Sequence, residues 1–269
     1  MKKPKLITEI LLFMLSLVFI IPAWMVLTNS FKEKKDANLF GIGLPAPFRF
    51  ENYLTVFAEG NVLRALFNGL VVSLSAVALV VLLSSISAFV LARRKSKITG
   101  AAYYFFVSGM IIPLAFVPTY MIMFVTKLNN TYPGLILIFT TLCLPISVFL
   151  YTGFIRSVPR ELDEAAIMDG CSGLRMFFSV IFPLLKPVTL TVVVFNFMGV
   201  WNDVQVQLFF ASGDKWSMPM TVYQFYGQYI KEWNLIFADV VIAIIPMLLL
   251  YIVGQKYMIE GMTAGAVKG

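Results

Sequence analysis

The side chains best suited to chemistry are polar groups that interrupt an apolar stretch at residues 188–210. They are Asn196, Asn202, Asp203, Gln205 and Gln207. Asn196, Asp203 and Gln207 are spaced at i, i+7 and i+11, so on a helix they share one face. Polar groups in an apolar environment are costly unless they face protein or water. Two interpretations stay open: these residues line a path for a polar solute, or they form hydrogen bonds between helices.

Catalytic chemistry is poorly supported, because the chain has no histidine. This excludes histidine-ligated metal sites and nucleophiles that a histidine activates. The two cysteines, Cys143 and Cys171, are too few for a disulfide framework. The sequence has no G-x-x-x-x-G-K-[ST] motif and therefore no nucleotide-binding P-loop. We expect no enzyme activity, cofactor or metal site in this chain, and a separate protein would have to hydrolyse any ATP that is used.

The segments that must position these polar groups are strongly apolar. The 269 residues are 59% hydrophobic and 13% charged, with a mean hydropathy of +0.86. Soluble domains average about 45–50% apolar and about 25% charged residues. The composition therefore indicates a polytopic membrane protein, and it excludes intrinsic disorder and a nucleic-acid-binding domain despite a net charge of +7. Helices satisfy their own backbone in lipid, so we expect an all-α fold.

Six stretches are long and apolar enough for a transmembrane helix, which needs roughly 20 residues. They cover residues 6–27, 66–91, 102–125, 133–155, 188–210 and 237–257. The first is too long for a signal peptide and lacks a cleavage motif, so we interpret it as an uncleaved span. Pro113 and Pro118 are expected to kink the third span. Lysine and arginine are enriched in one set of alternate loops, chiefly around Arg93 and Arg94, which predicts that both termini are cytosolic.

The cytosolic loop at residues 156–186 carries helix signals of its own. In chain order they are Ser157 and Pro159 at a start, acidic Glu161, Asp163 and Glu164, a stop at Gly170 and a second cap at Ser172. Leu162, Ala165, Ala166 and Asp169 share one narrow face of this predicted helix. The helix would lie in the groove of a partner or on the bilayer surface. Interfacial helices are usually basic, so its acidic start weighs against the bilayer.

The segment ELDEAAIMDGCS, continued by VIFPLLKP, resembles the EAA loop of ABC-importer permease subunits. The matching residues are Glu164, Ala165, Ala166, Gly170 and Pro183, with the apolar Val180 and Phe182 in place of Ile and Leu. Other stretches resemble the carbohydrate-importer branch, which includes the smaller permease subunit of the maltose importer. They are NGLVVSLSA from Asn68, LNNTYPGLIL from Leu128, Trp201-Asn202-Asp203 and the tail GMTAGAVKG. The resemblance covers residues 66–269.

This resemblance implies the six-helix type I ABC importer permease fold. It divides the chain into an N-terminal transmembrane helix with an extracytoplasmic loop (1–65), a transmembrane core (66–258) and a cytoplasmic tail (259–269). In this family the EAA loop forms a coupling helix docked in a separate ATPase. The residues so implied are Arg160, Glu161, Glu164, Ala165, Ala166, Asp169 and Gly170 in the loop, and Thr263, Gly265 and Lys268 in the tail.

The implied function is that of a carbohydrate importer's permease subunit in the bacterial cytoplasmic membrane. The implied partners are a second homologous permease, an ATPase dimer that binds ATP and Mg, an extracytoplasmic solute-binding protein, the sugar and the lipid bilayer. The sugar path would then include Asn196, Trp201, Asn202, Asp203 and Gln207. The alternative is an ion- or proton-coupled secondary transporter with Asp203 or Asp239 as its coupling site, but no inverted repeat supports it.

Overall fold

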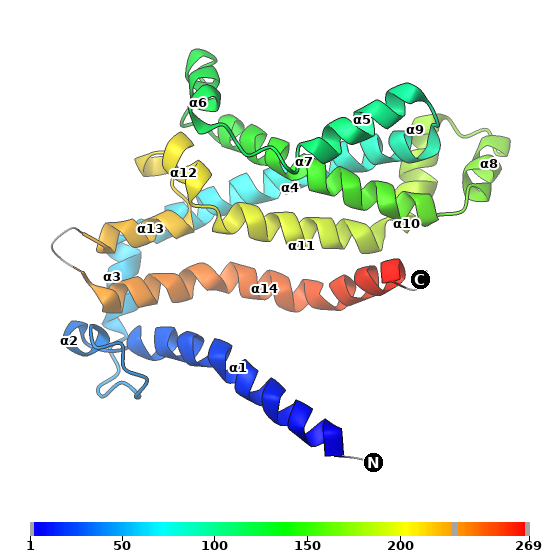
Figure 1. Cartoon of the computed structure of the whole chain (residues 1–269). Coiled ribbons are helices and arrows are strands. Elements are labelled where there is room, and N and C mark those ends of the chain that lie inside the picture. The colour runs from blue at the N-terminus through cyan, green and yellow to red at the C-terminus, as the bar shows by residue number, and fades with distance from the viewer. Residues whose placement is uncertain (1–2, 228–230, 267–269) are drawn as a thin grey trace. The chain divides into compact units, whose positions relative to one another are not determined.

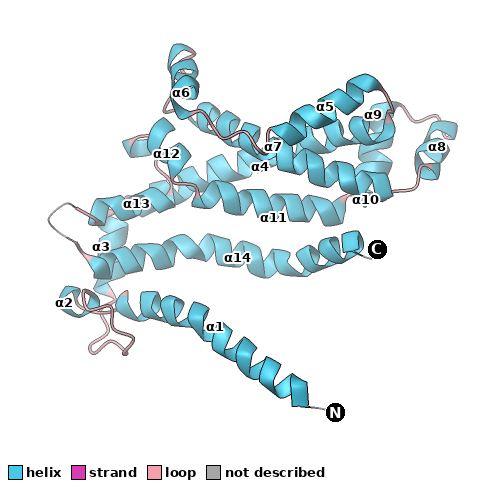
Figure 2. Cartoon of the chain, in the orientation of Figure 1, coloured by secondary structure: helices cyan, strands magenta, loops and turns pink. Residues whose placement is uncertain are grey.

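The computed structural model describes residues 3–227 and 231–266, and it leaves the side chains of residues 3–7, 253 and 256–266 outside the description. The described chain is helical, and its β-structure is one isolated bridge between Tyr226 and Lys231 (Figure 2). The longer helices are α1 (Lys3–Asn29), α3 (Glu51–Glu59), α4 (Val62–Arg93), α5 (Lys97–Ser108), α6 (Phe116–Val125), α7 (Tyr132–Ser157), α8 (Glu161–Met168), α11 (Lys186–Asn202), α13 (Met218–Phe225) and α14 (Trp233–Ala266). Shorter elements are α2 (Lys34–Ala37), α9 (Gly173–Met176), a π-helical turn (Phe177–Ile181), α10 (Phe182–Leu184), α12 (Gln205–Phe210) and a 3-10 turn (Gly213–Lys215). The all-α prediction is confirmed.

Within the described residues, four helices are long and apolar enough to cross a membrane. They are the apolar parts of α1, α4, α7 and α14, at Thr8–Asn29, Val62–Arg93, Tyr132–Ser157 and Trp233–Ile252. The pair Gly173–Leu184 and Lys186–Asn202, bent by 78°, adds a fifth if it counts as one span. These helices match the first, second, fourth, fifth and sixth predicted spans in position, while the count of six crossings stays a prediction.

The prediction of a third span that is helical throughout residues 102–125 was wrong. α5 ends at Ser108 and α6 begins at Phe116, so residues 109–115 separate them. Pro113 lies in this break, where it has no N–H to donate and disfavours helical geometry in the residue before it. A Cβ atom on Gly109 would lie 3.0 Å from Cγ of Pro145 on α7. The end of α5 therefore lies close against α7.

The fifth predicted span is also shorter than expected, because α11 ends at Asn202 rather than near residue 210. Asp203 has extended backbone geometry, with ψ of 124°. Its Oδ1 accepts a 2.7 Å hydrogen bond from the backbone N–H of Val206, in the first turn of α12. The side chain thus starts a new helix instead of continuing the old one, as Asp does at helix starts.

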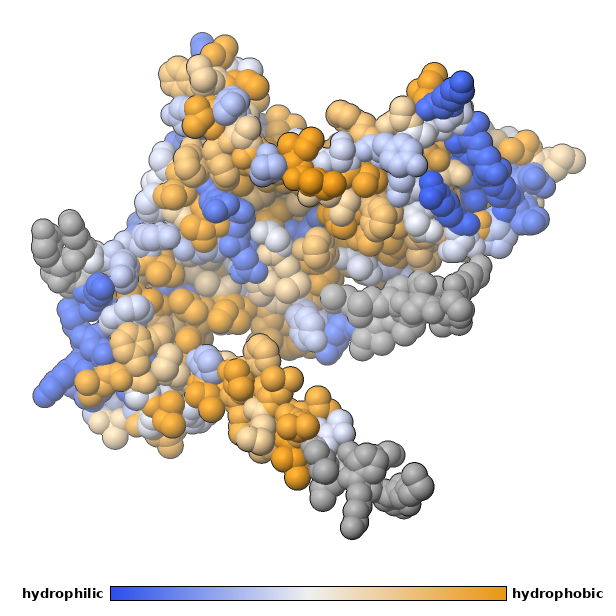
Figure 3. Space-filling view, viewed as in Figure 1, coloured by the Kyte–Doolittle hydropathy of each residue, from blue (hydrophilic) through white to orange (hydrophobic). Residues whose placement is uncertain are grey.

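The chain divides into two units, each described here by itself. Unit 1 holds Met1–Phe67 and Trp216–Pro246, and unit 2 holds Asn68–Lys215 and Met247–Gly269. In unit 1, Asn52 is the central polar residue: its amide donates to the carbonyls of Ser30 (2.8 Å) and Lys32 (2.9 Å) and accepts from Asn234 (2.8 Å). The outward faces of α1 are apolar and exposed, as expected of a surface in contact with lipid (Figure 3).

Unit 2 has a core that lies directly beneath the loop at residues 156–186. Both α5 and α11 pack against α7 (Figure 1). The buried members of this core come from α4, α7, the π-helical turn, the residue before α11, and α11 itself: Val80, Ala88, Tyr151, Ile155, Phe177, Ile181, Leu185, Val188 and Val192. The Tyr151 hydroxyl donates to Oγ1 of Thr189 at 2.9 Å and fixes α7 to α11. The ends of these helices form a rigid base for the loop.

Candidate functional site

Helix α8 begins later than the sequence predicts. Ser157 is the last residue of α7, and its hydroxyl donates to the Phe154 carbonyl at 2.7 Å, so it caps no following helix. Val158 is extended, and α8 begins at Glu161 with Arg160 at its N-cap and no side-chain cap. The prediction that Ser157 and Pro159 mark the start of this helix was therefore wrong, and α8 has 8 residues. The reason is that α7 is still helical where the second helix was expected to start.

The end of α8 confirms the predicted stop at Gly170. This residue has φ of +76°, a conformation that side chains with a Cβ rarely adopt. The Gly170 N–H donates to the Ile167 carbonyl (2.9 Å), and the Cys171 N–H donates to the Ala166 carbonyl (3.0 Å). This pair of bonds is a Schellman motif, which satisfies carbonyls at the helix end. Ser172 then caps α9, as predicted, by accepting from the Arg175 N–H.

The outer face of α8 is exposed, although five of its eight residues are apolar. Ala166 is buried against its own subunit, with 5% of its surface exposed, and it anchors the helix. Met168 and Ile167 are 87% and 59% exposed. Among the predicted coupling residues, Arg160, Glu161, Glu164, Ala165, Asp169 and Gly170 are exposed. Hydrophilic side chains gather around this end of unit 2 (Figure 3).

The residue that fixes α8 to the spans is Arg93, the last residue of α4. Its Nε lies 2.6 Å from Oδ2 of Asp163, and its Nη2 lies 3.2 Å from Oδ1. The two side chains are only 11% and 13% exposed. Two-pronged contact between a guanidinium and a carboxylate is among the strongest charge-assisted pairs. This ion pair links α4 to the first turn of α8.

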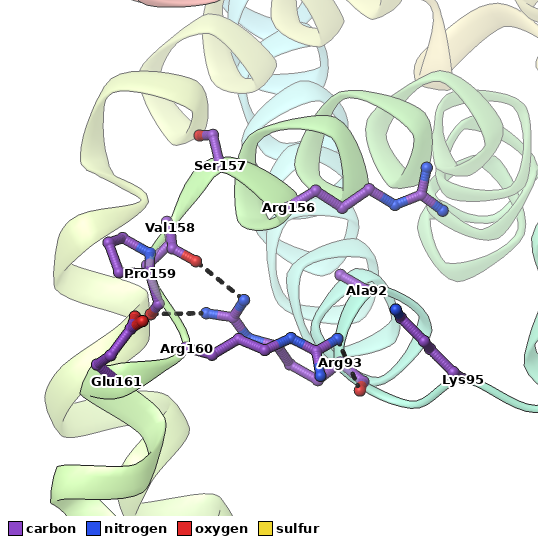
Figure 4. A pocket seen from close by; sticks show the side chains of 9 residues that line it. All are labelled: Ala92, Arg93, Lys95, Arg156, Ser157, Val158, Pro159, Arg160 and Glu161. Atoms are coloured by element: carbon purple, nitrogen blue, oxygen red, sulfur yellow. Dashed lines mark hydrogen bonds between the residues drawn. The ribbon is translucent and has the colours of Figure 1, made fainter.

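Arg93 also donates to backbone carbonyls at the end of α7. Its Nη1 donates to the carbonyl of Ile155 (3.3 Å). The same Nη1 donates to the carbonyl of Val158 (3.0 Å), and Nη2 donates to that of Pro159 (3.4 Å) (Figure 4). Arg160 returns a bond from its Nη2 to the Arg93 carbonyl at 3.4 Å. We call Arg93, Asp163 and these carbonyls the Arg93 clamp. Sequence analysis used Arg93 only as part of a positive cluster, and it gave no signal of this role.

A pocket lies beside the clamp, with a volume of about 570 Å³. Its lining comes from the end of α4 and from the start of the loop: Ala92, Arg93, Lys95, Arg156, Ser157, Val158, Pro159, Arg160 and Glu161 (Figure 4). Cationic side chains outnumber the single carboxylate. Across the described residues, no group of three or more His, Cys, Asp or Glu side chains could hold a metal ion.

The polar residues of the fifth predicted span do not form one exposed surface in this conformation. Asn196 is buried, and its amide donates to Oγ of Ser147 on α7 (2.9 Å) and to the Val192 carbonyl (2.8 Å). Trp201 is buried and stacks on Phe197 with ring centroids 5.6 Å apart. Buried Gln207 also faces protein, while Asn202 is exposed. The assignment of these residues to a solute path stays a prediction.

The predicted tail contacts lie at the edge of the description. The backbones of Thr263 and Gly265 belong to α14, but their side chains are outside the described set. Lys268 lies outside the described residues altogether. Asp239, proposed as an alternative coupling site, is buried and accepts a 2.7 Å hydrogen bond from the Thr221 hydroxyl.

Several helices that are long and apolar enough to cross a membrane, with a short helix exposed on the loop between two of them, define a class: multi-pass membrane proteins. The chain matches the family described as "Binding-protein-dependent transport system inner membrane component" over residues 80–263. It therefore belongs to that family, whose members are transport subunits and not catalytic enzymes. Its fold is that of an ABC importer permease, as a solved structure demonstrates: a bacterial ABC transporter involved in alginate import. That structure has a TM-score of 0.83 and 19% identity, covering 94% of this chain and 96% of that one.

Two curated relatives are similar over almost their whole length. The melibiose/raffinose/stachyose import permease protein MelC of Bacillus subtilis is 36% identical, covering 93% of this chain and 91% of MelC. The probable starch degradation products transport system permease protein AmyC of Thermoanaerobacterium thermosulfurigenes is 34% identical, covering 94% of this chain and 93% of AmyC. The resemblance to sugar-importer permeases is thereby confirmed.

Proposed function

We propose that this chain is a transmembrane permease subunit of an ATP-driven carbohydrate importer. It would form half of the translocation pathway and be coupled to a separate ATPase through α8. Family membership and the named sugar permeases among its relatives support this proposal. Its setting would be the bacterial cytoplasmic membrane, with both termini and α8 in the cytosol. Its partners would be a homologous permease, an ATPase dimer that binds ATP and Mg, and an extracytoplasmic solute-binding protein.

The observation that carries the coupling proposal is the surface of α8. Ile167 and Met168 are large apolar side chains exposed on a short helix at a loop tip, next to the small, exposed Ala165. Exposed apolar surface rimmed by charge is typical of a binding surface for another protein. Small side chains let a groove wall approach the helix closely, and the acidic Glu161 and Glu164 would restrict the groove to a neutral or basic one.

The Arg93 clamp supports the mechanical half of the proposal. When the ATPase subunits move together, they would displace α8, and the ion pair with Asp163 would transmit that displacement to the end of α4. The carbonyl contacts at Ile155 and Val158 would transmit it to α7. The spans would then rock between inward-facing and outward-facing arrangements. Asn202 and Asp203, which are not fully buried, are the first candidates for contact with the moving sugar.

The test is a charge reversal on the exposed face of α8. Glu164→Lys should weaken association of the permease with its ATPase by about tenfold or more, which corresponds to about 1.4 kcal/mol. Sugar uptake should fall in parallel. The matched control is Glu59→Lys, since Glu59 is an exposed glutamate at the end of α3, far along the chain. Unchanged association and normal uptake in Glu164→Lys would contradict the proposal.

A further inference from the structure

A second basic pocket lies where α4 joins α5, and it shares Arg156 with the first pocket. Its volume is about 340 Å³, within the about 300–1,000 Å³ usual for small-ligand sites. The side chains that line it are Leu91, Ala92, Arg94, Lys95, Ser96, Thr99, Gly100, Tyr103, Tyr104 and Arg156. Three are cations, none is a carboxylate, and four carry hydroxyl groups. We call it the α4–α5 pocket.

No residue in the described part of the chain forms an ion pair with the cations of this pocket. The neighbouring Arg93 forms an ion pair with Asp163, whereas Arg94, Lys95 and Arg156 form no ion pair with any described residue. The guanidinium of Arg156 lies over the ring of Tyr103, 5.1 Å from its centroid. This cation–π contact orients the guanidinium and leaves its charge in place. The pocket thus concentrates positive charge that an anion would neutralise.

The position of the pocket, at the ends of two membrane spans, indicates that such an anion would be a lipid headgroup. α4 and α7 are two of the long apolar spans, and residues from their last turns line the pocket: Leu91 and Ala92 of α4, and Arg156 of α7. The adjoining α5 exposes a row of large side chains: Ile98 (81%), Tyr104 (73%) and Phe105 (76%). A phosphate in the pocket would therefore lie at the level of the lipid headgroups, with an apolar helix face beside it for acyl chains.

We propose that the α4–α5 pocket binds the phosphate headgroup of an anionic phospholipid. Arg94, Lys95 and Arg156 pair with the phosphate, the hydroxyls of Ser96 and Thr99 lie within the same lining, and the acyl chains lie along the exposed face of α5. Basic pockets between helix ends are a general way to hold anionic headgroups. The proposal depends on the placement of α4 and α7 in a membrane, and it is independent of how α8 meets its partner.

The test measures lipid retained by the intact transporter, purified into nanodiscs that contain phosphatidylglycerol and phosphatidylcholine. Each surface-near cation contributes about fivefold to the affinity for anionic lipid. Arg94→Gln with Arg156→Gln should therefore lower the affinity for phosphatidylglycerol about 25-fold and leave that for phosphatidylcholine unchanged. The matched control is Arg175→Gln with Lys186→Gln, since these exposed cations of the same loop lie outside the pocket.

Several outcomes would overturn the proposal. Equal retention of phosphatidylglycerol by both double variants would do so, because the charge would then act only through the general surface potential. Displacement of the lipid by millimolar inorganic phosphate would assign the pocket to a free anion. Loss of the ATPase from the Arg94 and Arg156 variant, with lipid retained, would assign it to a protein partner. Failure of the Glu164→Lys test would leave this result unaffected.

Discussion

Replacement of Arg93 by methionine is the sharpest test of how the loop is held. Methionine keeps an unbranched apolar stem but removes the partner of Asp163 and the donor to three carbonyls. Breaking a buried ion pair by removing one partner costs about 3–5 kcal/mol. The two side chains are still about one-tenth exposed, so we expect the lower end, about 3 kcal/mol. At about 2–4 °C per kcal/mol, the Tm of the purified subunit should fall by about 6–12 °C.

Thermal unfolding in detergent measures this effect, and a double-mutant cycle isolates the ion pair. Asp163→Asn should cost less than Arg93→Met, because Arg93 keeps its carbonyl acceptors when the carboxylate is lost. In the double variant the two losses should not add, since both break the same contact. The control is Arg175→Met, an exposed arginine on α9. A Tm for Arg93→Met equal to that of the control would refute the clamp, and additive losses would refute its ion-pair component.

Three further predictions concern backbone geometry and helix packing. Gly170→Val should destabilise the loop by about 1–2 kcal/mol, because φ at this position is +76°. The loop of the variant should be cleaved faster by a protease, and an unchanged cleavage rate would argue against backbone strain at this position. Gly254→Val should disrupt the packing of α14 on α11, since a Cβ atom there would lie 2.7 Å from Cγ2 of Val194; a normal Tm would show that the helices separate easily. Asn196→Leu should lower the free energy of unfolding in detergent by about 0.6 kcal/mol, because the hydrogen bond to Ser147 is lost. A change in sugar preference without this loss of stability would place Asn196 in the solute path.

The fold could be predicted from the sequence wherever one property dominates a long segment. The stretches that became α1, α4, α7 and α14 are uniformly apolar over 20 or more residues, so hydropathy alone locates them. The failures fall where a single side chain decides the geometry. Asp203 can continue α11 or cap α12, and sequence reasoning weighed it only as a polar group in a span. Pro113 was expected to bend a helix that it instead helps to end.

In the candidate site, features set by neighbouring residues could be predicted from the sequence, and contacts between distant residues could not. Gly170 and Ser172 act on backbone groups a few residues away, and the rules for helix ends predict them. The contact between Arg93 and Asp163 joins residues 70 positions apart, and neither residue carries a local signal for the other. Ser157 was misassigned because its local pattern suits a helix start, whereas α7, with Ile155 buried in the core, continues as far as Ser157.

The clamp also indicates how a displacement of the short α8 would reach the long helices. α8 has 8 residues, too few to be stable alone in water. Its place is fixed by buried Ala166, by the Schellman motif at Gly170 and by Arg93, so it moves only if the ends of α4 and α7 move with it. A contact that displaced α8 without displacing those ends would have to break a buried ion pair. A shift of the loop together with the spans leaves this ion pair intact and therefore costs less free energy. Transmission of force from a partner would require such a joint shift.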